Sequence, residues 1–355
     1  MMRIKVEKLQ AFVVEVMKKL GCDAEKADAV AEVLVEADMR GITSHGVARL
    51  KRYMDHIREG IIDPSAEPSI IFETPISIVV DGRNGVGQYV AKWVMRKVIE
   101  KAKLHGACFA TVRNSNHYGI AGYYAEMAVK DKLMGVSMTN SAPLVVHTFA
   151  REPLLGTNPI AFAFPTNEKY PILVDMATSV IPRGKLEVYS RLGKKIPVGW
   201  AVDETGHSTT DPEKVLIGIK NRKAGILPLG GEGETFGGHK GYGLALIVEL
   251  LTSGLSLGHF SFDTYKEKGN ITHFFAAVDL SLFGDPNEIM KHVNVLMSSL
   301  KNAKKAVGCS RIYVHGEKEY EKRKKSLEYG IEIDEPVYKS LKEIAKELGI
   351  QQEIK

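Results

Sequence analysis

The sequence predicts an α/β protein with a central mixed sheet flanked by helices and a second, helical lobe built from the two chain ends. Strand and helix signals alternate through the centre of the 355-residue chain, whereas both ends are charged and typical of helices. The glycine spacing of an ordinary doubly wound dinucleotide fold is absent. We therefore expect a helical lobe of residues 1–75 plus 300–355, and a central α/β domain of residues 76–299.

The first 60 residues are predicted to be helical. Asp23 suits an N-cap, and Glu25 lies in the first turn, where the helix dipole favours a negative charge. Residues 27–35 would form the body of that helix. The pattern then changes to two short strands, 69–72 and 76–80, around a turn that contains a proline.

The central segment is predicted to alternate between strands and helices. A helix over 87–105 precedes the first of these strands, and another helix follows His117. The predicted strands span residues 107–112, 134–138, 160–164, 172–175 and 272–278. Residues 241–253 are apolar on nearly every side, which predicts a buried helix.

Composition narrows the class of protein. No apolar run is long enough to span a membrane, and the charged start lacks a signal peptide, so we expect a cytoplasmic protein without a membrane partner. Cys22, Cys108 and Cys309 are widely spaced, which indicates neither a disulfide framework nor a zinc site. The chain has 34 Lys and 29 Glu but only 4 Gln, a skew typical of heat-adapted proteins.

The net charge of +5 comes largely from basic residues after position 300. Glutamates interrupt the later part of this run, so a solvated helix face explains it better than a nucleic-acid-binding surface.

The first polar cluster spans residues 43–53. If a helix begins near Ser44, then His45, Arg49 and Tyr53 lie four residues apart on one face. Arginine can bind a carboxylate with two hydrogen bonds, and histidine exchanges protons near neutral pH. The cluster therefore suits a small carboxylate substrate that gains or loses a proton. An ordinary surface helix with Ser44 as its N-cap explains these residues equally well.

A second cluster, residues 113–122, lies between a predicted strand and a predicted helix. Ligands bind at such turns, and His117 could exchange a proton or orient a cofactor there. Alternatively, Ser115 or Asn116 only caps the helix.

The third cluster, residues 230–243, contains seven glycines, which allow the backbone to approach a ligand closely. His239 and Lys240 add positive charge before an apolar helix, as in a phosphate site. A flexible surface loop is the alternative.

The fourth cluster comprises residues 156–159, 175–179 and 182–185, and it offers the Thr157 hydroxyl and the Arg183 guanidinium. Taken singly, these segments are more typical of turns.

Several catalytic signatures are missing or misleading. Neither Gly-x-Gly-x-x-Gly, nor a phosphate-binding P-loop, nor a metal-ligand cluster occurs. Residues 254–258 match the Gly-x-Ser-x-Gly pattern of hydrolases around Ser256. They follow an apolar helix rather than a strand, so we interpret them as a helix stop.

Taken together, these motifs resemble one known family. The segments that carry the resemblance are Ser44-His45-Gly46-x-x-Arg49, Asn116-His117-Tyr118-Gly119, Gly156-Thr157-Asn158-Pro159, Asp175-Met176-Ala177-Thr178, Gly238-His239-Lys240-Gly241 and His315-Gly316-Glu317-Lys318-Glu319. Their order across nearly the whole chain is similar to the type 2 malate/L-lactate dehydrogenases, which are not Rossmann enzymes. That family includes archaeal malate dehydrogenases, the nearest likeness, together with sulfolactate, ureidoglycolate and piperideine-2-carboxylate enzymes.

The resemblance implies a homodimer that binds NAD or NADP, without a metal or nucleic acid. It also implies roles for individual residues. Ser44 and His45 resemble the proton-relay pair, with His117 as the competing acid/base, and the substrate carboxylate would contact Arg49, Thr157, Arg183 and Gly184. The cofactor would contact His117, Tyr118, Gly119, Ile120, Ala121, Asp175, Met176, Ala177, His239, Lys240, Gly316, Glu317 and Lys318. Some relatives carry an acidic residue where this chain has Lys185.

The expected reaction is hydride transfer between NAD(P) and a small 2-hydroxy acid, with malate and oxaloacetate as the leading pair. Lactate, sulfolactate, ureidoglycolate or a cyclic imino acid are alternative substrates. A serine hydrolase that uses Ser256 or Ser44 is a distant alternative.

Overall fold

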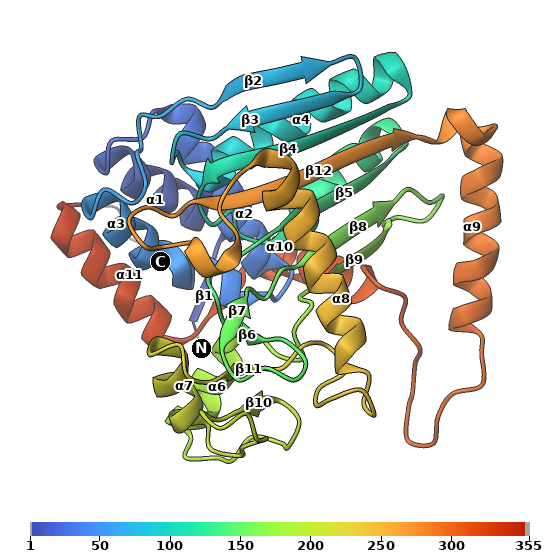
Figure 1. Cartoon of the computed structure of the whole chain (residues 1–355). Helices are drawn as coiled ribbons and strands as arrows, with labels where there is room; N and C mark the ends of the chain where they lie inside the picture. Colours follow the sequence, from blue (N-terminus) through green and yellow to red (C-terminus); the bar gives the residue numbers. More distant parts are fainter. Residues whose placement is uncertain (1, 352–355) are drawn as a thin grey trace.

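A seven-stranded mixed sheet forms the centre of the molecule in the computed structural model, which describes residues 2–351 (Figure 1). The strand order is β2 (Ser69–Thr74), β3 (Ser77–Asp81), β4 (Ala107–Ser115), β12 (Ile271–Asp279), β5 (Leu133–Thr139), β8 (Ile160–Phe164) and β9 (Ile172–Met176). Within this sheet, as described over residues 2–351, β3 and β4 pair in parallel and the other neighbouring strands pair antiparallel. The predicted mixed, non-Rossmann sheet is therefore confirmed.

Helices cover both faces of this sheet. On one face, α4 (Gly87–His105) contacts β4 and β12, and α5 (Ala121–Met127) contacts β5 and β8. The helix predicted over 87–105 is confirmed at both ends. On the other face, a π-helical turn (Leu250–Gly254) at the end of α8 (Gly238–Glu249) contacts β4 and β12.

The two ends of the chain lie together. Strand β1 (Met2–Ile4) pairs antiparallel with β13 (Ile331–Ile333). Next to this pair, four helices share one buried apolar core: α1 (Val6–Lys19), α2 (Ala24–Met39), α3 (Leu50–Arg58) and α11 (Glu335–Leu348). The predicted cap is confirmed, because Asp23 Oδ1 accepts a hydrogen bond from Lys26 N at 2.9 Å.

Two features differ from the predicted division of the chain. Residues 69–74, assigned to the helical lobe, form the edge strand β2 of the sheet. Within 76–299, a second and smaller sheet has its own apolar core. Its elements are β6 (Val145–Val146), β7 (Pro153–Leu155), β10 (Ala201–Val202) and β11 (Gly225–Ile226), with α6 (Arg183–Arg191) and α7 (Pro212–Lys220) beside them.

The apolar helix predicted to be buried, residues 241–253, is instead exposed along one side that continues from α8 into the π-helical turn. Leu246, Ile247 and Leu250 keep 42%, 47% and 54% of their surface accessible. The prediction was wrong because one side of α8 meets solvent rather than a layer of this chain. Helix α9 (Pro286–Lys301) stands at the edge of the molecule, and a long segment leads from it to α10 (Glu317–Tyr329) (Figure 1).

None of the helices within residues 2–351 combines the length and the apolar character that crossing a bilayer requires.

The shared core of the chain ends should tolerate little loss of volume. Leu34 on α2 is fully buried in it, so Leu34→Ala should lower the free energy of unfolding by about 2–5 kcal/mol. Leu104→Ala, on an α4 residue that is 78% exposed, is the matched control and should change stability by less than about 0.5 kcal/mol. Urea denaturation followed by circular dichroism measures both variants, and equal losses would contradict the assigned core.

Candidate active site

The segment predicted to be one helix from Ser44 is broken. Two 3₁₀ turns, Thr43–His45 and Val47–Arg49, are separated by Gly46, whose backbone is extended (φ −86°, ψ −153°). The buried carboxylate of Asp38 accepts a hydrogen bond from Val47 N at 2.8 Å. A side chain at position 46 would clash with this carboxylate, since a Cβ would lie 1.9 Å from Asp38 Oδ1. The Asp38 carboxylate and the absence of a side chain at Gly46 thus give the segment its shape.

The broken segment still brings the predicted side chains to a common place. Tyr53 Oη lies 2.6 Å from Nδ1 of His117, which belongs to the loop between β4 and α5. The rings of His45 and His117 are stacked, with centroids 5.6 Å apart. Ser44 Oγ lies 2.9 Å from His45 Nδ1. Two histidines, a tyrosine and a serine therefore form one connected polar group.

Both histidines are held in the neutral form at pH 7. Burial, reinforced by the Arg49 charge, lowers the pKa of His45 to about 4. Burial also lowers the pKa of His117 well below its usual value, and neighbouring positive charges act in the same direction. A neutral histidine can accept a proton from a substrate hydroxyl.

The hydrogen bonds of His117 also indicate its tautomer. The backbone N–H of Gly119 donates to His117 Nδ1 at 3.3 Å, so Nδ1 is an acceptor and Tyr53 donates to it as well. The proton of neutral His117 is then on Nε2. His45 lacks this constraint, because a serine hydroxyl can either donate to Nδ1 or accept from it.

A cavity of about 400 Å³ lies against this polar group. It is lined by every predicted proton-relay and substrate-contact residue: Ser44, His45, His117, Arg49, Thr157, Arg183 and Gly184. A Cβ built on Gly184 would meet nothing within 4 Å. The glycine therefore leaves room inside the cavity.

Three arginines line the cavity. Arg49 Nε donates to the carbonyl of Ser44 at 2.6 Å, and Arg183 Nε donates to Glu187 Oε1 at 3.0 Å. The third, Arg52, lies over the ring of Tyr265. The sequence did not single out Arg52 or Tyr265. The spacing of Arg52, three residues after Arg49, weakly indicated that it lies on the same side of the chain. Nothing in the sequence around Tyr265 indicated that it belongs to the cavity.

A second cleft, of about 320 Å³, lies beside the cavity. Several predicted cofactor residues line it, namely Ile120, Asp175, Gly316 and Lys318, together with Arg40, His315 and Glu319. Gly119 lines the first cavity and its neighbour Ile120 lines the cleft, so one stretch of backbone separates the two.

The chemistry of this cleft fits a dinucleotide. Its basic side chains suit a diphosphate, and its carboxylates suit ribose hydroxyls. Asp175 Oδ2 accepts a hydrogen bond from Gly122 N at 2.7 Å. Surrounding atoms desolvate this carboxyl and raise its pKa to about 6, although part of the residue remains accessible at the cleft.

Other predicted cofactor residues lie outside the lining of both spaces. His239 and Lys240 are exposed in the first turn of α8. Met176 ends β9, Ala177 follows it, and Ala121 is buried at the start of α5. These five assignments stay predictions that the lining does not support.

Glu317 has a different environment from the one predicted. Its buried carboxylate pairs with Lys301 and Arg311 and accepts from Val314 N. Although burial opposes the effect, these partners hold the pKa of Glu317 at about 2. The residue serves to fix the turn that precedes α10. Tyr118 is among the residues that line the first cavity, but its ring is buried. It stacks on the ring of His273, with the two centroids 4.5 Å apart.

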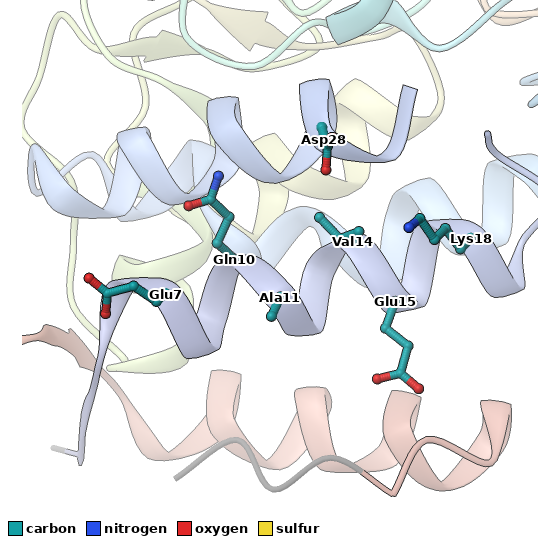
Figure 2. A pocket seen from close by; sticks show the side chains of 7 residues that line it. All are labelled: Glu7, Gln10, Ala11, Val14, Glu15, Lys18 and Asp28. Carbon is teal, nitrogen blue, oxygen red and sulfur yellow. The ribbon is translucent and has the colours of Figure 1, made fainter. Parts of the chain in front are cut away.

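Other candidate sites offer less chemistry. A larger but open hollow of about 510 Å³ lies along α1, and its lining contains no histidine, cysteine, serine or arginine (Figure 2). Ser256 is buried, and its Oγ donates to Ser253 O and accepts from Gly258 N, as expected for a helix stop. Within residues 2–351, no group of three or more His, Cys, Asp or Glu could hold a metal ion.

Comparison with known proteins finds relatives that match over nearly the whole chain. Residues 4–342 match the family model described as malate/L-lactate dehydrogenase. The chain is 46% identical to malate dehydrogenase of Pyrococcus horikoshii, over 98% of this chain and 96% of that protein. It is 40% identical to L-sulfolactate dehydrogenase of Methanocaldococcus jannaschii, over 98% of each. The crystal structure of malate dehydrogenase from Entamoeba histolytica superposes with a TM-score of 0.95 at 39% identity, over 98% of each chain.

These similarities define the class of protein as an oxidoreductase with a nicotinamide cofactor. Within that class, the chain belongs to the malate/L-lactate dehydrogenase family.

The Asp38 carboxylate should leave a pH signature in stability. Burial, reinforced by the Asp334 charge, raises the pKa of Asp38 to about 7 from an ordinary value of 3.8. The folded state therefore binds a proton that the unfolded state has lost, and the stability that this group contributes below pH 4 is lost as the pH rises to about 7. Asp38→Asn abolishes the titration. Its free energy of unfolding relative to wild type should therefore rise between pH 4 and pH 7, by on the order of 4 kcal/mol.

Thermal unfolding of both proteins across this pH range measures the difference. Asp28→Asn, on an exposed residue of the same helix, is the control and should show no comparable trend. A flat difference for Asp38→Asn would show that the carboxyl titrates normally.

Proposed function

We propose that this enzyme interconverts malate and oxaloacetate with NAD or NADP. The observation that carries the proposal is a single cavity in which two neutral histidines lie beside three guanidinium groups. Such a cavity can exchange one proton and bind a small organic anion. The relatives named malate dehydrogenase support the choice of substrate.

Arg49 is the proposed partner of the carboxylate next to the reacting carbon. Its Nε is already engaged with Ser44 O, which orients the guanidinium. The same bond ties the arginine to the residue before His45, so a bound carboxylate is placed relative to the histidine. Thr157 and Gly184 line the same cavity and suit the remaining contacts of this carboxylate.

His45 is the proposed base for oxidation of the hydroxyl group. Its contact with a rotating serine hydroxyl allows the tautomer in which Nε2 accepts a proton. His117 carries its proton on Nε2, so it suits a hydrogen-bond donor that steadies the substrate oxygen. This division of labour favours His45 over His117 as the acid/base.

The second cleft is the proposed cofactor site. His315 and Lys318 would hold the phosphates, whereas Arg40 is already paired with Glu36 and Glu126. Asp175 and Glu319 would contact the sugars. When bound, the nicotinamide accepts the hydride that leaves C2 of the hydroxy acid. The residues of this chain position the substrate and move its proton.

We also propose that the enzyme is a homodimer of the cytoplasm. Support for the dimer comes from exposed apolar side chains on α8, on the π-helical turn after it and on α9, among them Leu246, Leu250, Val295 and Leu296. Support for the compartment comes from the cysteines, because Cys22, Cys108 and Cys309 are all free thiols.

Absorbance at 340 nm tests the proposal directly. NADH and NADPH are each supplied with oxaloacetate, sulfopyruvate, pyruvate, glyoxylate derivatives and a cyclic imino acid. Fastest turnover of oxaloacetate supports the proposal, whereas fastest turnover of another compound reassigns the substrate. Turnover of none, together with labelling of Ser256 or Ser44 by a fluorophosphonate, would favour a hydrolase instead.

Removing the proposed base should reduce turnover while leaving cofactor binding intact. His45→Ala should lower kcat by about 10²- to 10⁴-fold, because general-base catalysis contributes about this much. Steady-state kinetics measures the loss, and quenching of protein fluorescence by NADH measures cofactor affinity, which should change little. His117→Ala is the comparison. If it loses more activity than His45→Ala, the acid/base role moves to His117.

Replacing Arg49 by lysine should weaken substrate binding. An ammonium group keeps the charge but cannot form two parallel hydrogen bonds to a carboxylate, so KM for malate should rise about tenfold or more. Arg58→Lys is the control, because Arg58 is an exposed arginine at the end of α3 that pairs with Glu347 of α11. An unaltered KM in Arg49→Lys would remove this residue from the substrate site.

A further inference from the structure

The charge of the substrate cavity is larger than a monocarboxylate needs. Arg49, Arg52 and Arg183 line it, and Glu187 is the one acidic residue among its lining residues. With both histidines neutral, the formal balance is +3 and −1, a net charge of +2. Partly desolvated positive charges are costly unless anions pair with them. A dianion would match this cavity, whereas a monoanion would leave one charge unpaired.

Arg49 and Arg52 are the two guanidinium groups of the cavity without a carboxylate partner within residues 2–351, and Arg49 is already assigned to the carboxylate next to the reacting carbon. Arg183 is paired with Glu187, and Arg49 is bonded to the Ser44 carbonyl. For Arg52, the ion pairs formed within residues 2–351 include no carboxylate partner. Its Nε instead lies 3.5 Å from Nε2 of His56. Its remaining donors are thus suited to an anion from outside the chain.

Tyr265 holds Arg52 in place. The guanidinium carbon lies 5.5 Å from the centroid of the Tyr265 ring, and the same ring contacts His56 at 5.6 Å. Tyr265 also forms a side-chain hydrogen bond with Arg52. Because a guanidinium carries five N–H donors, others remain available to a ligand.

The backbone at Tyr265 reinforces this interpretation. Its φ of +54° lies in the left-handed region, which is uncommon for a bulky residue and is a strained conformation. Such conformations concentrate at ligand sites, and here the conformation places an aromatic ring in the substrate cavity beside Arg52.

We propose that Arg52, steadied by Tyr265, binds the second acid group of a dianionic 2-hydroxy or 2-oxo acid and thereby selects against monoanions. The proposal rests on the proposed function and names the class of substrate for the same site. A carboxylate and a sulfonate share the required chemistry, since both present two or three oxygens to a guanidinium.

Kinetics with paired substrates tests this selection. Wild type, Arg52→Gln, Arg52→Lys and the control Lys51→Gln are compared on oxaloacetate, sulfopyruvate and 2-oxobutyrate. Lys51 lies on the same helix and pairs with Asp55, and it is not among the residues that line the cavity. Arg52→Gln should lower kcat/KM for the favoured dianion by about 10- to 100-fold, and for 2-oxobutyrate by less than about threefold. Arg52→Lys should recover part of the loss, and Lys51→Gln should resemble wild type.

In the wild-type enzyme, the ratio of kcat/KM for oxaloacetate to kcat/KM for sulfopyruvate shows whether the preferred second acid group is a carboxylate or a sulfonate. The proposal would be overturned if Arg52→Gln lowered kcat/KM equally for the dianion and for the monoanion. The proposed dehydrogenase activity would not be affected by that result.

Calorimetric titration separates the inference from the proposed function. Succinate and butyrate differ only in the second carboxylate, and neither has to react. Wild type should bind succinate more tightly, and Arg52→Gln should lose most of this preference. Failure of every 2-oxo acid to turn over would reject the proposed function, yet the succinate titration would still decide the role of Arg52. Unchanged succinate affinity in Arg52→Gln would reject that role.

Discussion

The hydrogen bond between Tyr53 Oη and His117 Nδ1 joins the two halves of the site. Tyr53 lies on α3, in the core formed by the chain ends, and His117 follows a central strand of the sheet. The substrate cavity therefore exists only when the helical core and the sheet are docked. Burial strengthens this bond, because Tyr53 is buried and His117 is only partly exposed at the cavity. Folding of the terminal segments and formation of the site are thus the same event.

Electrostatics explains why histidines can work among arginines. Burial and nearby guanidinium groups disfavour the imidazolium, so neither histidine adds to the positive charge at neutral pH. The arginines remain charged because guanidinium loses its proton only in strong base. In the proposed reaction, the arginines would thus bind the anion and the neutral imidazoles would transfer the proton.

The sequence was most informative where chemistry and local pattern coincide. The short motifs at 44–49 and 117–119 identified the cavity, because their residue types are unusual together, and the helix over 87–105 followed from its period and end signals. Three features needed the tertiary structure. The break at Gly46 depends on Asp38, Tyr265 reaches Arg52 from a distant loop, and the exposed side of α8 has an apolar pattern that local reasoning takes for burial.

One stretch of backbone sets the geometry on which the proposed hydride transfer would depend. Gly119 lines the substrate cavity and Ile120 lines the neighbouring cleft, so a ligand in each space would meet across this wall. Gly119 has a φ of +88°, and a Cβ there would lie 2.4 Å from Val33 of α2. A larger residue would push the wall away from the helical core that carries His45 and Arg49. Because position 119 is a glycine, α2 can pack closely against this stretch of backbone, and the same packing fixes the distance between the two spaces. Transfer between ligands bound in them would require that distance to stay constant.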